Sequence, residues 1–501
     1  MPLRRRFVMA ARERRPPGPR PLTSVLIALL LRLCVMPARP LWLAALCGLA
    51  AVGAAAAPPM DTGQARSIAS DAYVYAYPLV LMDVARQVQT NVEAADAAMG
   101  GGAPVNQFTH MRRPADALLH GHSYPDVETL WSSLWFDVTK EPLLIEIPNA
   151  GGRYYTMTLA DMWTDVFAAP GTRTVQDGPQ VYAIVAPTWQ GKLPKPAIAL
   201  RAPTSVGLLT LRVAYRGMAD AGAAQSFQAG LQATPLSRWG RKNAPQAGHF
   251  DVAQSRRAPV DQVADMNPQA FFAAFAELAA KYPPHANDYP ILQRMARLGL
   301  APGTRFDMSR LPADMRMAVE AGVQRGQASV RSPMQPRPRP GDAWRMPDRR
   351  RGAYGTDYAL RARAARAALV TPLPEDAIEL LASTDSDGRP LDGSFRYEVR
   401  FDRGQLPPVD AFWSMTLYND RRELYDNRIG LYAVGSRHPL VPGLDGTATA
   451  YVQYAQPVGE LVRNWLPAPQ SGRFMLMLRL YQPGEDAVEG MWVPPTIRRI
   501  Q

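Results

Sequence analysis

The spacing of hydrophobic positions changes three times along the chain, and each change predicts a different kind of structure. In residues 65–88 the apolar side chains fall on one face of a helix, at Ile68, Ala72, Tyr75, Leu79 and Met82. Pro78 lies inside this pattern, and proline removes a helical hydrogen bond. We therefore expect a helix that breaks or kinks near Tyr77, followed by a Gly-, Asn- and Pro-rich loop over 91–125.

Short runs of β-branched and aromatic residues, bounded by Pro or Gly, dominate residues 128–215 and return after residue 394. Between them the spacing is helical, most clearly in 269–282, 289–300 and 357–369. Closely spaced strands of this kind are typical of a β-sandwich. The pattern predicts an α+β fold with two β-sandwich, jelly-roll-like units and a helical region between them.

The two strand-rich regions resemble each other. "YYTMTLAD" at 154–161 matches "FWSMTLYN" at 412–419, and "APTSVGLLTLR" at 202–212 matches "APQSGRFMLMLR" at 468–479 with one residue inserted. Both matches occur in the same order along the chain, which predicts an internal duplication of one sandwich unit.

Each copy contains an arginine inside an apolar strand, Arg212 in the first and Arg479 in the second. A buried guanidinium without a partner costs several kcal/mol. We expect each arginine to form a structural ion pair first and to bind a ligand second.

Residues 1–57 differ from the rest, with arginines near the start and an apolar stretch over 41–54. Small residues up to Ala57 precede Pro58, as at a signal-peptidase site, so we expect a cleaved leader and export to the periplasm or the medium. An uncleaved anchor helix is the alternative, and translation from Met36 would still produce a complete signal peptide.

Charge and cysteine content narrow the function classes. Cys34 and Cys47 both lie in the leader, so disulfides, thiolate metal sites and a cysteine nucleophile are excluded for residues 58–501.

The net charge of +12 lies mostly in the leader, which carries nine Arg and one Glu. Only +4 remains for residues 58–501, and the Arg/Pro-rich segment 331–352 accounts for +5. The remainder is nearly neutral, which argues against a nucleic-acid partner. Segment 331–352 itself is expected to be a solvated linker.

These patterns divide the chain into five parts. We expect a leader at 1–57, a helix and loop lead-in at 65–127, a first sandwich at 128–215, a helical connection with the linker at 216–370, and a second sandwich at 371–501.

The chain has no sequence signature of a nucleotide site, a zinc protease or a serine hydrolase elbow. His120 and His122 would share a side of a strand, but a catalytic zinc needs a third protein ligand, for which His110 and Glu128 are the nearby candidates. Because the segment looks like a Gly-rich loop, we expect no metal and no cofactor.

Carboxylates are the more suggestive chemical groups. Hydrolysis of glycosides uses an acid and a base about 5 to 9 Å apart, and Asp126 and Glu128 would lie about 7 Å apart on one side of a strand. Asp161 and Asp165 flank Trp163, which could stack on a sugar. Capping a turn or holding an arginine is the ordinary role of such acids. We name Asp126, Glu128 and Asp161 as candidate catalytic residues.

Aromatic residues at strand ends suggest a ligand cleft with apolar walls and a few polar groups. Together with residues of the family motifs described next, the candidate ligand-binding residues are Tyr154, Tyr155, Trp163, Arg173, Trp413, Tyr418, Asn464 and Trp465.

The chain resembles the paired bacterial families of unknown function 1254 and 1214. The resemblance rests on "AYVYAYPLVLM" (72–82) and "GRYYTMTLADMWTDVFAAPGTR" (152–173), and on "PPVDAFWSMTLYN" (407–419) and "NWLPAPQSGRFMLMLRLYQP" (464–483). It implies two sandwich domains and leaves the activity open. The chain departs from the family pattern at three positions, where Asp126, Glu128 and Trp131 replace Asn, Asp and Tyr.

These observations favour an exported envelope protein that binds a small polar or glycan-like ligand in a cleft of the sandwich units. A cofactor-independent hydrolase that uses a carboxylate pair in the same cleft is the first alternative. The second alternative is a structural envelope protein that self-associates. In each case the membrane is a partner only through an uncleaved leader.

Overall fold

The computed structural model describes residues 60–95, 101–119, 123–175, 178–241, 245–333 and 342–500. The expected leader, His120 and His122 lie outside the described residues. Within the described ranges, no helix combines the length and the apolar character that a bilayer crossing requires.

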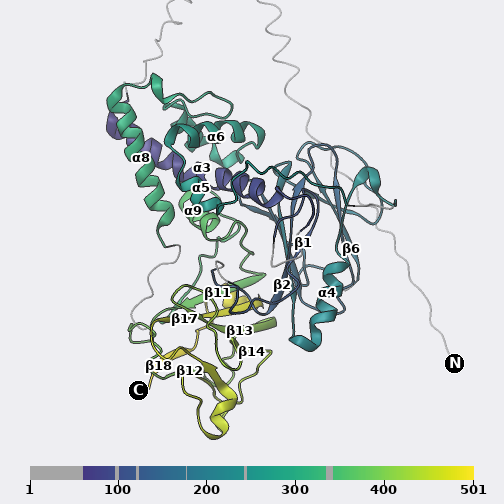
Figure 1. The fold of residues 1–501 in the computed structure, drawn as a ribbon, viewed down its shortest axis with the longest axis vertical. Helices are drawn as coiled ribbons and strands as arrows, with labels where there is room; N and C mark the ends of the chain where they lie inside the picture. Colours follow the sequence, from purple (N-terminus) through teal and green to yellow (C-terminus); the bar gives the residue numbers. More distant parts are fainter. Residues whose placement is uncertain are drawn as a thin grey trace, which may run out of the picture. The chain divides into compact units, whose positions relative to one another are not determined.

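The first half of the chain forms a sandwich of two mostly antiparallel sheets (Figure 1). In spatial order, the first sheet contains β1 (Thr109–His110), β2 (Thr129–Asp137), β8 (Val206–Ala214), β4 (Tyr155–Asp161) and β5 (Val166–Ala168). The second contains β7 (Ile198–Arg201), β6 (Gln180–Val185), β3 (Leu143–Ile147) and β9 (Gln232–Pro235). Apolar residues from both sheets form one core, including Leu134, Leu209 and Ile145. The strands of this unit begin before and end after the expected range 128–215.

The second half repeats this architecture. Its first sheet contains, in spatial order, β10 (Trp344–Arg345), β11 (Ala377–Ala382), β17 (Phe474–Pro483), β13 (Val409–Asn419) and β14 (Ala433–Gly435). Its second sheet contains β16 (Trp465–Pro467), β15 (Ala448–Gln453), β12 (Tyr397–Phe401) and β18 (Thr496–Arg499). Residues such as Leu478 and Val399 join the two sheets in a second core.

Both sandwiches have the same topology, with every strand shifted by nine in number. The order β1-β2-β8-β4-β5 becomes β10-β11-β17-β13-β14, and β7-β6-β3-β9 becomes β16-β15-β12-β18. Even the single parallel pair recurs, as β6 with β7 and β15 with β16. This agreement supports the internal duplication predicted from the strand sequences.

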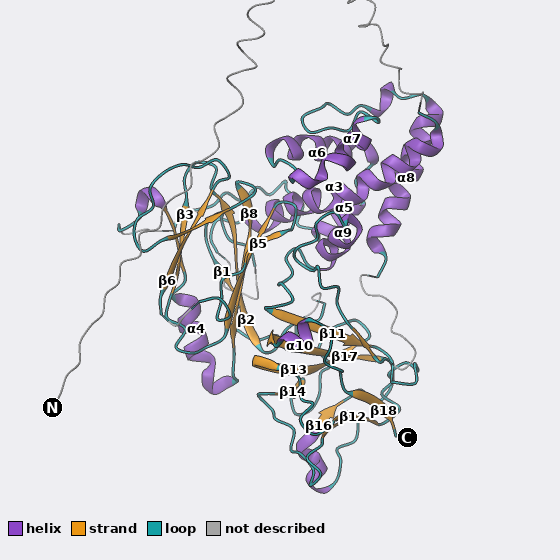
Figure 2. Cartoon of the chain, turned by 180° about the vertical axis from the view of Figure 1, so that it is seen from behind, coloured by secondary structure: helices purple, strands orange, loops and turns teal. Residues whose placement is uncertain are grey.

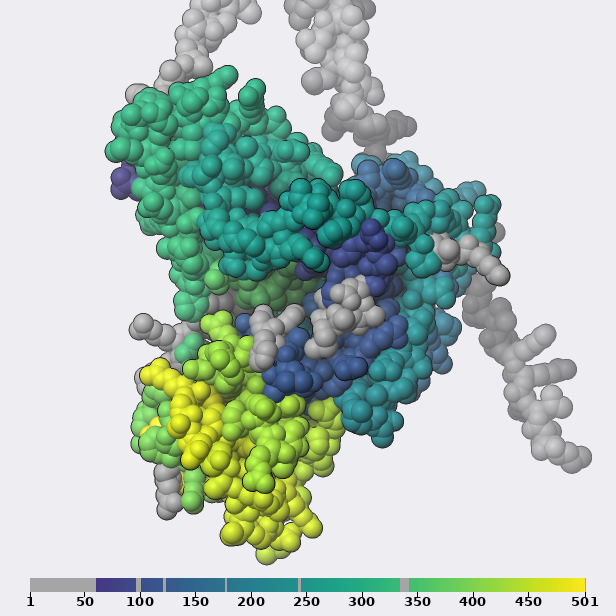
Figure 3. All heavy atoms as spheres, in the orientation of Figure 1, coloured from purple at the N-terminus to yellow at the C-terminus, as the bar shows by residue number. Residues whose placement is uncertain are grey.

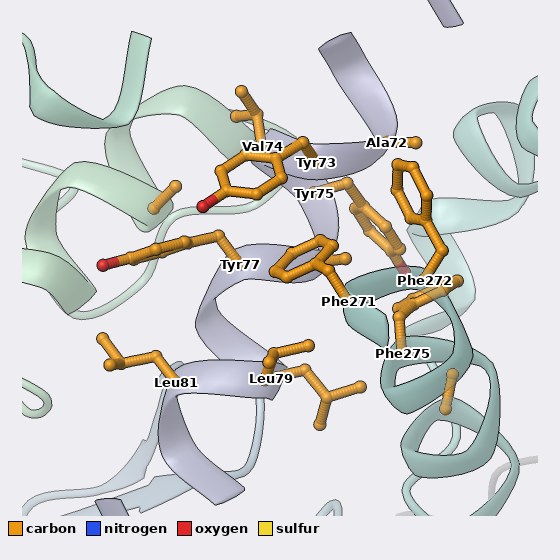
Figure 4. Close-up of a cluster of buried hydrophobic side chains, with 14 of the residues drawn as sticks. Ala72, Tyr73, Val74, Tyr75, Tyr77, Leu79, Leu81, Phe271, Phe272 and Phe275 are labelled. Carbon is orange, nitrogen blue, oxygen red and sulfur yellow. The ribbon is translucent and has the colours of Figure 1, made fainter. Parts of the chain in front are cut away.

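The helices form a third part of the fold, grouped together in Figure 2. They are α3 (Thr62–Thr90), α5 (Pro259–Ala264), α6 (Pro268–Lys281), α7 (Tyr289–Ala296), α8 (Ala313–Arg331) and α9 (Tyr358–Ala367). Two further helices lie outside this group: α4 (Ala221–Ala229) packs on the first sandwich, and α10 (Glu485–Val488) follows β17. Aromatic residues of α3 and α6 interlock at the centre of this helical core (Figure 4). Tyr73 stacks on Phe271, with 4.3 Å between ring centroids.

Helix α3 corrects one expectation, because it continues through Pro78 without a break. Asp61 caps its N-terminus by accepting from the Gln64 N–H at 2.7 Å. Most residues from Ala65 to Ala85 are buried against the other helices. Burial of apolar surface on several sides outweighs the one hydrogen bond that proline removes.

Part of the expected linker 331–352 belongs to the second sandwich. Trp344 lies in β10 and is buried in the second core, where its indole N–H donates to the Pro495 carbonyl at 2.7 Å. Arg351 is also buried and lies 3.5 Å from the Glu379 carboxylate. The Arg/Pro composition indicated solvent exposure, whereas Trp344 and Arg351 are buried in the structure.

Close packing of α8 on α3 predicts the result of one glycine substitution. A Cβ atom at Gly322 would lie 2.5 Å from the Arg66 carbonyl oxygen and 2.7 Å from the Ala69 Cβ. Replacing an interior helix glycine with alanine usually stabilises by roughly 0.5–1 kcal/mol. For Gly322→Ala we expect the opposite sign, a loss of about 1–3 kcal/mol, because the two helices must separate.

Thermal and urea unfolding would test this prediction against Gly222→Ala in α4, where a Cβ meets open space. The α4 variant is expected to gain stability. An equal gain in both variants would contradict the tight approach of α8 to α3.

The two sandwiches contact each other through the outer faces of their five-stranded sheets. Tyr154 and Ala214 of the first pack against Tyr481, Phe412 and Ala411 of the second. In the space-filling view, blue residues of the first unit lie directly against yellow-green residues of the second (Figure 3). The duplicated arginines are on these outer faces, because their strand neighbours Leu211 and Leu478 face the cores.

Candidate functional site

A short irregular segment, which we call the strap (residues 124–128), lies between the sandwiches just before β2. Residues of the second sandwich hold its backbone. Arg479 donates from Nη2 to the Tyr124 carbonyl at 2.7 Å, and the Tyr418 hydroxyl donates to the Pro125 carbonyl at 2.7 Å. Arg479 Nη1 in turn donates to the Tyr418 oxygen at 2.6 Å. The strap therefore directly precedes a strand of the first sandwich, while its carbonyl groups at Tyr124 and Pro125 are bonded by the second.

Asp126 is the most heavily bonded residue of the strap. Its Oδ1 accepts from the Glu128 N–H at 2.7 Å and from the Tyr481 hydroxyl at 2.8 Å. Its Oδ2 accepts from the Thr129 hydroxyl at 2.6 Å and from Arg212 Nη1 at 2.8 Å. Burial alone raises the pKa of Asp126, but the charges of the arginines and these hydrogen bonds outweigh it and lower the pKa. Asp126 is a structural anion.

Glu128 has a different environment, although it is only two residues away. The side chain is 5% exposed, and its Oε1 lies 3.3 Å from Arg437 Nη2. Burial raises the pKa of Glu128 to about 7, a rise that Arg437 opposes and the Asp126 charge reinforces. A carboxyl group with a pKa near 7 can both give and accept a proton at neutral pH.

The sequence placed Asp126 and Glu128 on one side of a strand, and this placement is wrong. Strand β2 begins at Thr129, and Asp126 folds back in a turn that accepts the N–H of residue 128. Such turns are common before strands and helices, because aspartate side chains bond the backbone two residues on.

The duplicated arginines form the ion pairs that the sequence predicted. Arg212 pairs with Asp126 at 2.8 Å, and Arg479 Nε lies 3.2 Å from the Glu379 carboxylate. Burial raises the pKa of Glu379, but Arg479 and its neighbouring arginines lower it to about 2. Each pair lies within one sandwich, and the bonds that cross between the sandwiches include those of Arg479, Tyr418 and Tyr481 to the strap.

A pocket of about 750 Å³ opens beside the strap, and we call it the inter-sandwich pocket. Both sandwiches line it, through Glu128, Gly152, Tyr154, Thr172, Val175, Ala214, Tyr215 and Arg216 of the first and Asp410, Ala411, Phe412, Ser436, Arg437 and Gln482 of the second. Its volume is within the usual range for small-molecule sites.

The pocket combines aromatic walls with polar groups. Tyr154 and Phe412 meet edge to face, with ring centroids 5.3 Å apart, and the Arg437 guanidinium lies 5.8 Å from the Tyr215 ring centroid. Gln482 has a φ of 50°, a left-handed conformation that is rare outside glycine and often occurs at functional sites. Apolar walls with a few fixed polar groups are typical of ligand sites.

A separate cavity of about 660 Å³ lies within the second sandwich, beside Trp344 and Trp492. We favour the inter-sandwich pocket as the functional site, because it joins both units and is lined by the buried Glu128 carboxyl group.

Of the sequence-predicted ligand residues, Tyr154 lines the pocket, whereas Arg173 and Tyr418 do not. Tyr154 lines it and donates its hydroxyl to the Asp376 carbonyl at 3.1 Å. Arg173 pairs with the same residue that Tyr154 contacts, because its Nε lies 2.8 Å from the Asp376 carboxylate. Tyr418 holds the strap, as described above.

Four other residues predicted to bind a ligand instead pack in a core or form hydrogen bonds to the backbone. Tyr155 lies in the first core and Trp413 in the second. Asn464 bonds the backbone of Val441, and the Trp465 indole donates to the Gln453 carbonyl at 2.8 Å. Neither Asn464 nor Trp465 lines the inter-sandwich pocket.

Asp161 and Trp163 belong to a different cluster, at the end of β4 where it packs on the helices. His285 Nε2 is 2.6 Å from Asp161 Oδ2. Trp163 is fully buried and its indole donates to the Tyr282 carbonyl at 3.2 Å. The structure thus separates Asp161 from Asp126 and Glu128, which the sequence had grouped in one cleft.

Comparison with known proteins agrees with the two halves of the fold. Residues 105–235 match the model of a protein family of unknown function, DUF1254, and residues 376–485 match that of a second, DUF1214. The chain carries a DUF1254 region followed by a DUF1214 region. The inter-sandwich pocket is lined by residues of both regions, so neither region forms it alone.

The fold is also found in a solved structure. The crystal structure of the VPA0106 protein from Vibrio parahaemolyticus matches with a TM-score of 0.64 and 21% identity, covering 87% of this chain and all of that one. An uncharacterised protein from Burkholderia cenocepacia matches with a TM-score of 0.38 and 14% identity, covering 85% of this chain and 87% of its own. No curated protein matches the chain.

Sequence reasoning missed several residues of the pocket, among them Arg437 in the DUF1214 region. It lies in a loop after β14, outside any periodic pattern. Phe412 was quoted only as part of a strand motif, and nothing in its local sequence distinguishes it from a core residue. The exposed pocket residues Arg216 and Asp410 resemble ordinary surface charges.

Proposed function

We propose that this protein is an exported binding protein for a small polar or glycan-like ligand, and that the ligand occupies the inter-sandwich pocket. The observation that supports the proposal is a pocket of about 750 Å³ lined by both sandwiches, with aromatic walls and a buried glutamate. Export is supported by the sequence of residues 1–57 alone.

The composition of the pocket favours a polar ligand with one apolar face. Tyr154, Tyr215 and Phe412 supply ring surfaces against which a sugar or similar ring can pack. Arg216 and Arg437 balance Asp410 and Glu128 in charge when Glu128 is ionised. Because the pKa of Glu128 is about 7, the pocket changes between neutral and singly positive near neutral pH. A neutral or weakly anionic ligand fits this charge.

Binding can be tested by thermal shift with a library of metabolites and glycans. A ligand present at 100 times its dissociation constant adds about 2.7 kcal/mol to the free energy of unfolding. We expect Phe412→Ala to weaken binding of any hit at least 10-fold, since the ring forms a pocket wall. The matched control is Val493→Ala, a 75% exposed residue of the separate cavity. If Val493→Ala loses binding while Phe412→Ala binds as the wild type does, the proposal is contradicted.

A hydrolase at the same pocket is the second candidate, and the pKa of Glu128 favours it. Asp126 is unsuited to acid–base catalysis because Arg212 and Tyr481 occupy both its oxygens. Asp410 is the other carboxylate of the pocket, so Glu128 and Asp410 are the pair to test. A hydrolase loses turnover on Glu128→Gln while it still binds substrate.

The library screen also separates these functions from a structural role. A binding protein shows melting shifts without turnover, and a hydrolase shows both. A structural envelope protein shows neither, and its variants fail only in assembly.

A further inference from the structure

The second cluster contains three side chains of metal-ligating type from separate segments, which we call the histidine cluster: Asp161, Asp165 and His285. One ligand atom from each lies within 4.8 Å of the others. His285 Nε2 is 2.6 Å from Asp161 Oδ2, and its Nδ1 is 3.7 Å from Asp165 Oδ2. Asp161 ends β4, Asp165 precedes β5, and His285 caps a short 3-10 helix, η3 (Ala286–Asp288).

Backbone groups hold the two carboxylates in orientation. Asp161 Oδ1 accepts the N–H groups of Trp163 and Asp165 at 2.9 and 3.1 Å, which leaves Oδ2 directed at His285. Asp165 Oδ1 accepts from the Tyr354 N–H at 3.0 Å. Each carboxylate therefore has one oxygen fixed by the backbone and one facing the imidazole. Metal ligands are commonly fixed by outer hydrogen bonds in this way.

A second observation comes from the buried charges behind the cluster. Arg361 is 0% exposed and bonds Asp165 Oδ2 from Nη1 at 3.0 Å, while its Nε and Nη2 have no hydrogen-bond partner in the part of the chain that the structure describes. Asp288, 1% exposed, accepts from the Tyr75 hydroxyl at Oδ2 and lies 4.0 Å from the same guanidinium, while its Oδ1 has no hydrogen-bond partner among the described residues. The aromatic rings of Tyr75 and Trp163 cover Arg361.

These groups are unbalanced in charge. With a neutral His285, three carboxylates face one guanidinium and the group carries −2 in an apolar surrounding. Burying unpaired charge is costly, so the group favours a cation. A proton on His285 supplies half of the missing charge, and a divalent ion supplies all of it.

We propose that the histidine cluster binds a divalent transition-metal ion, with Zn²⁺ the best match, through Asp161, Asp165 and His285. One imidazole and two carboxylates are ligands that zinc accepts, and three protein ligands leave a fourth position for water. His285 and Asp165 have side chains that are 27% and 18% exposed, so water can reach that position. Tetrahedral ligands lie about 3.3 Å apart, so the ion widens the contact between His285 and Asp161.

This arrangement makes the cluster a second chemical site, independent of the inter-sandwich pocket. A zinc-bound water ionises near neutral pH and becomes a nucleophile. Asp288 and Arg361 lie behind the ligands, where they tune the charge of the site.

The test uses the full chain, purified without a histidine tag, stripped with EDTA and then given Zn²⁺ again, with unbound ion removed. We expect about one Zn²⁺ per chain by elemental analysis, and a visible absorption band when Co²⁺ replaces it. His285→Ala is expected to weaken binding about 100-fold or more, and Asp288→Asn about 10-fold. The matched control is His249→Ala, an exposed histidine elsewhere on the first half of the chain, which should bind as the wild type does.

Circular dichroism confirms that each variant is folded, and His285→Gln provides a variant of similar size. If the stripped wild type takes up no more Zn²⁺ than His285→Ala does, the proposal is overturned. In that case His285 is the protonated member of an ion pair with Asp161 and Asp165. Equal loss of binding in His249→Ala would also overturn it.

Discussion

Replacing Asp126 with alanine is expected to lower the free energy of unfolding by about 3–5 kcal/mol, the range for breaking a buried ion pair. The substitution removes all four hydrogen bonds to the strap carboxylate. The Tyr481 hydroxyl, which is nearly inaccessible, loses its acceptor, and Arg212 loses its counter-ion. Arg212 keeps some contact with water, because its side chain is 34% exposed, so we expect the lower half of the range.

Urea unfolding measures this effect directly, with Asp265→Ala as the matched control. Asp265 pairs with Arg257 at 2.7 Å, but both side chains are about 60% exposed, 62% and 60% respectively. Exposed pairs contribute roughly 0–1 kcal/mol. Asp126→Asn keeps the shape and removes the charge, so it should fall between wild type and alanine. Similar losses for Asp126→Ala and Asp265→Ala would show that the bonds to the Asp126 carboxylate contribute no more to stability than an exposed pair does.

Glu128→Gln is expected to stabilise the protein increasingly as the pH rises from about 4.5 to 7. In the unfolded chain the carboxyl group loses its proton near the usual pKa of 4.5, whereas in the folded chain it keeps the proton until about 7. Between these values the folded state binds more protons, so the free energy of unfolding falls by up to about 1.36 kcal/mol per pH unit. Glutamine does not titrate, so the variant does not lose this stability. The loss in the wild type totals on the order of 3 kcal/mol above pH 7.

The prediction concerns the difference between the variant and the wild type, measured by urea unfolding at several pH values. The pKa of about 7 already includes the attraction of Arg437 for the ionised carboxylate. Exchanging protonated Glu128 for glutamine shifts the difference by the same amount at every pH, so the slope against pH tests the prediction. Glu277→Gln, on an exposed position of α6, should stay within about 0.5 kcal/mol of the wild type throughout. A flat difference for Glu128→Gln between pH 4.5 and 7 would mean that Glu128 ionises as an ordinary surface glutamate does.

Local sequence was sufficient for most of the fold. The period of two in the strands and 3.6 in the helices follows from backbone geometry, so α6, α7 and α9 occur where the pattern predicts them. Pro78 shows the limit of local rules, because packing around α3 decided its continuity. The second half of segment 331–352 shows the same limit, since composition suggested solvent and burial decided otherwise.

The candidate site was less predictable, because its residues are far apart in the chain. The sequence indicated that Arg212 and Arg479 need carboxylates, yet their partners lie 86 and 100 residues away. Asp161 and His285 are 124 residues apart, and no periodicity links them. Only the packing of separate segments selects such partners.

The sequence by itself determined the two sandwiches, their duplication and the need of each duplicated arginine for a counter-ion, because strand alternation and the cost of a buried charge are local properties. The tertiary structure decided that the outer faces of the two sheets meet and that the strap crosses between them. It also decided that Asp126 became a structural anion while Glu128, two residues on, entered a pocket with a raised pKa. Contacts between distant segments set the burial and the neighbouring charges of each carboxyl group, and these two quantities decide its chemistry.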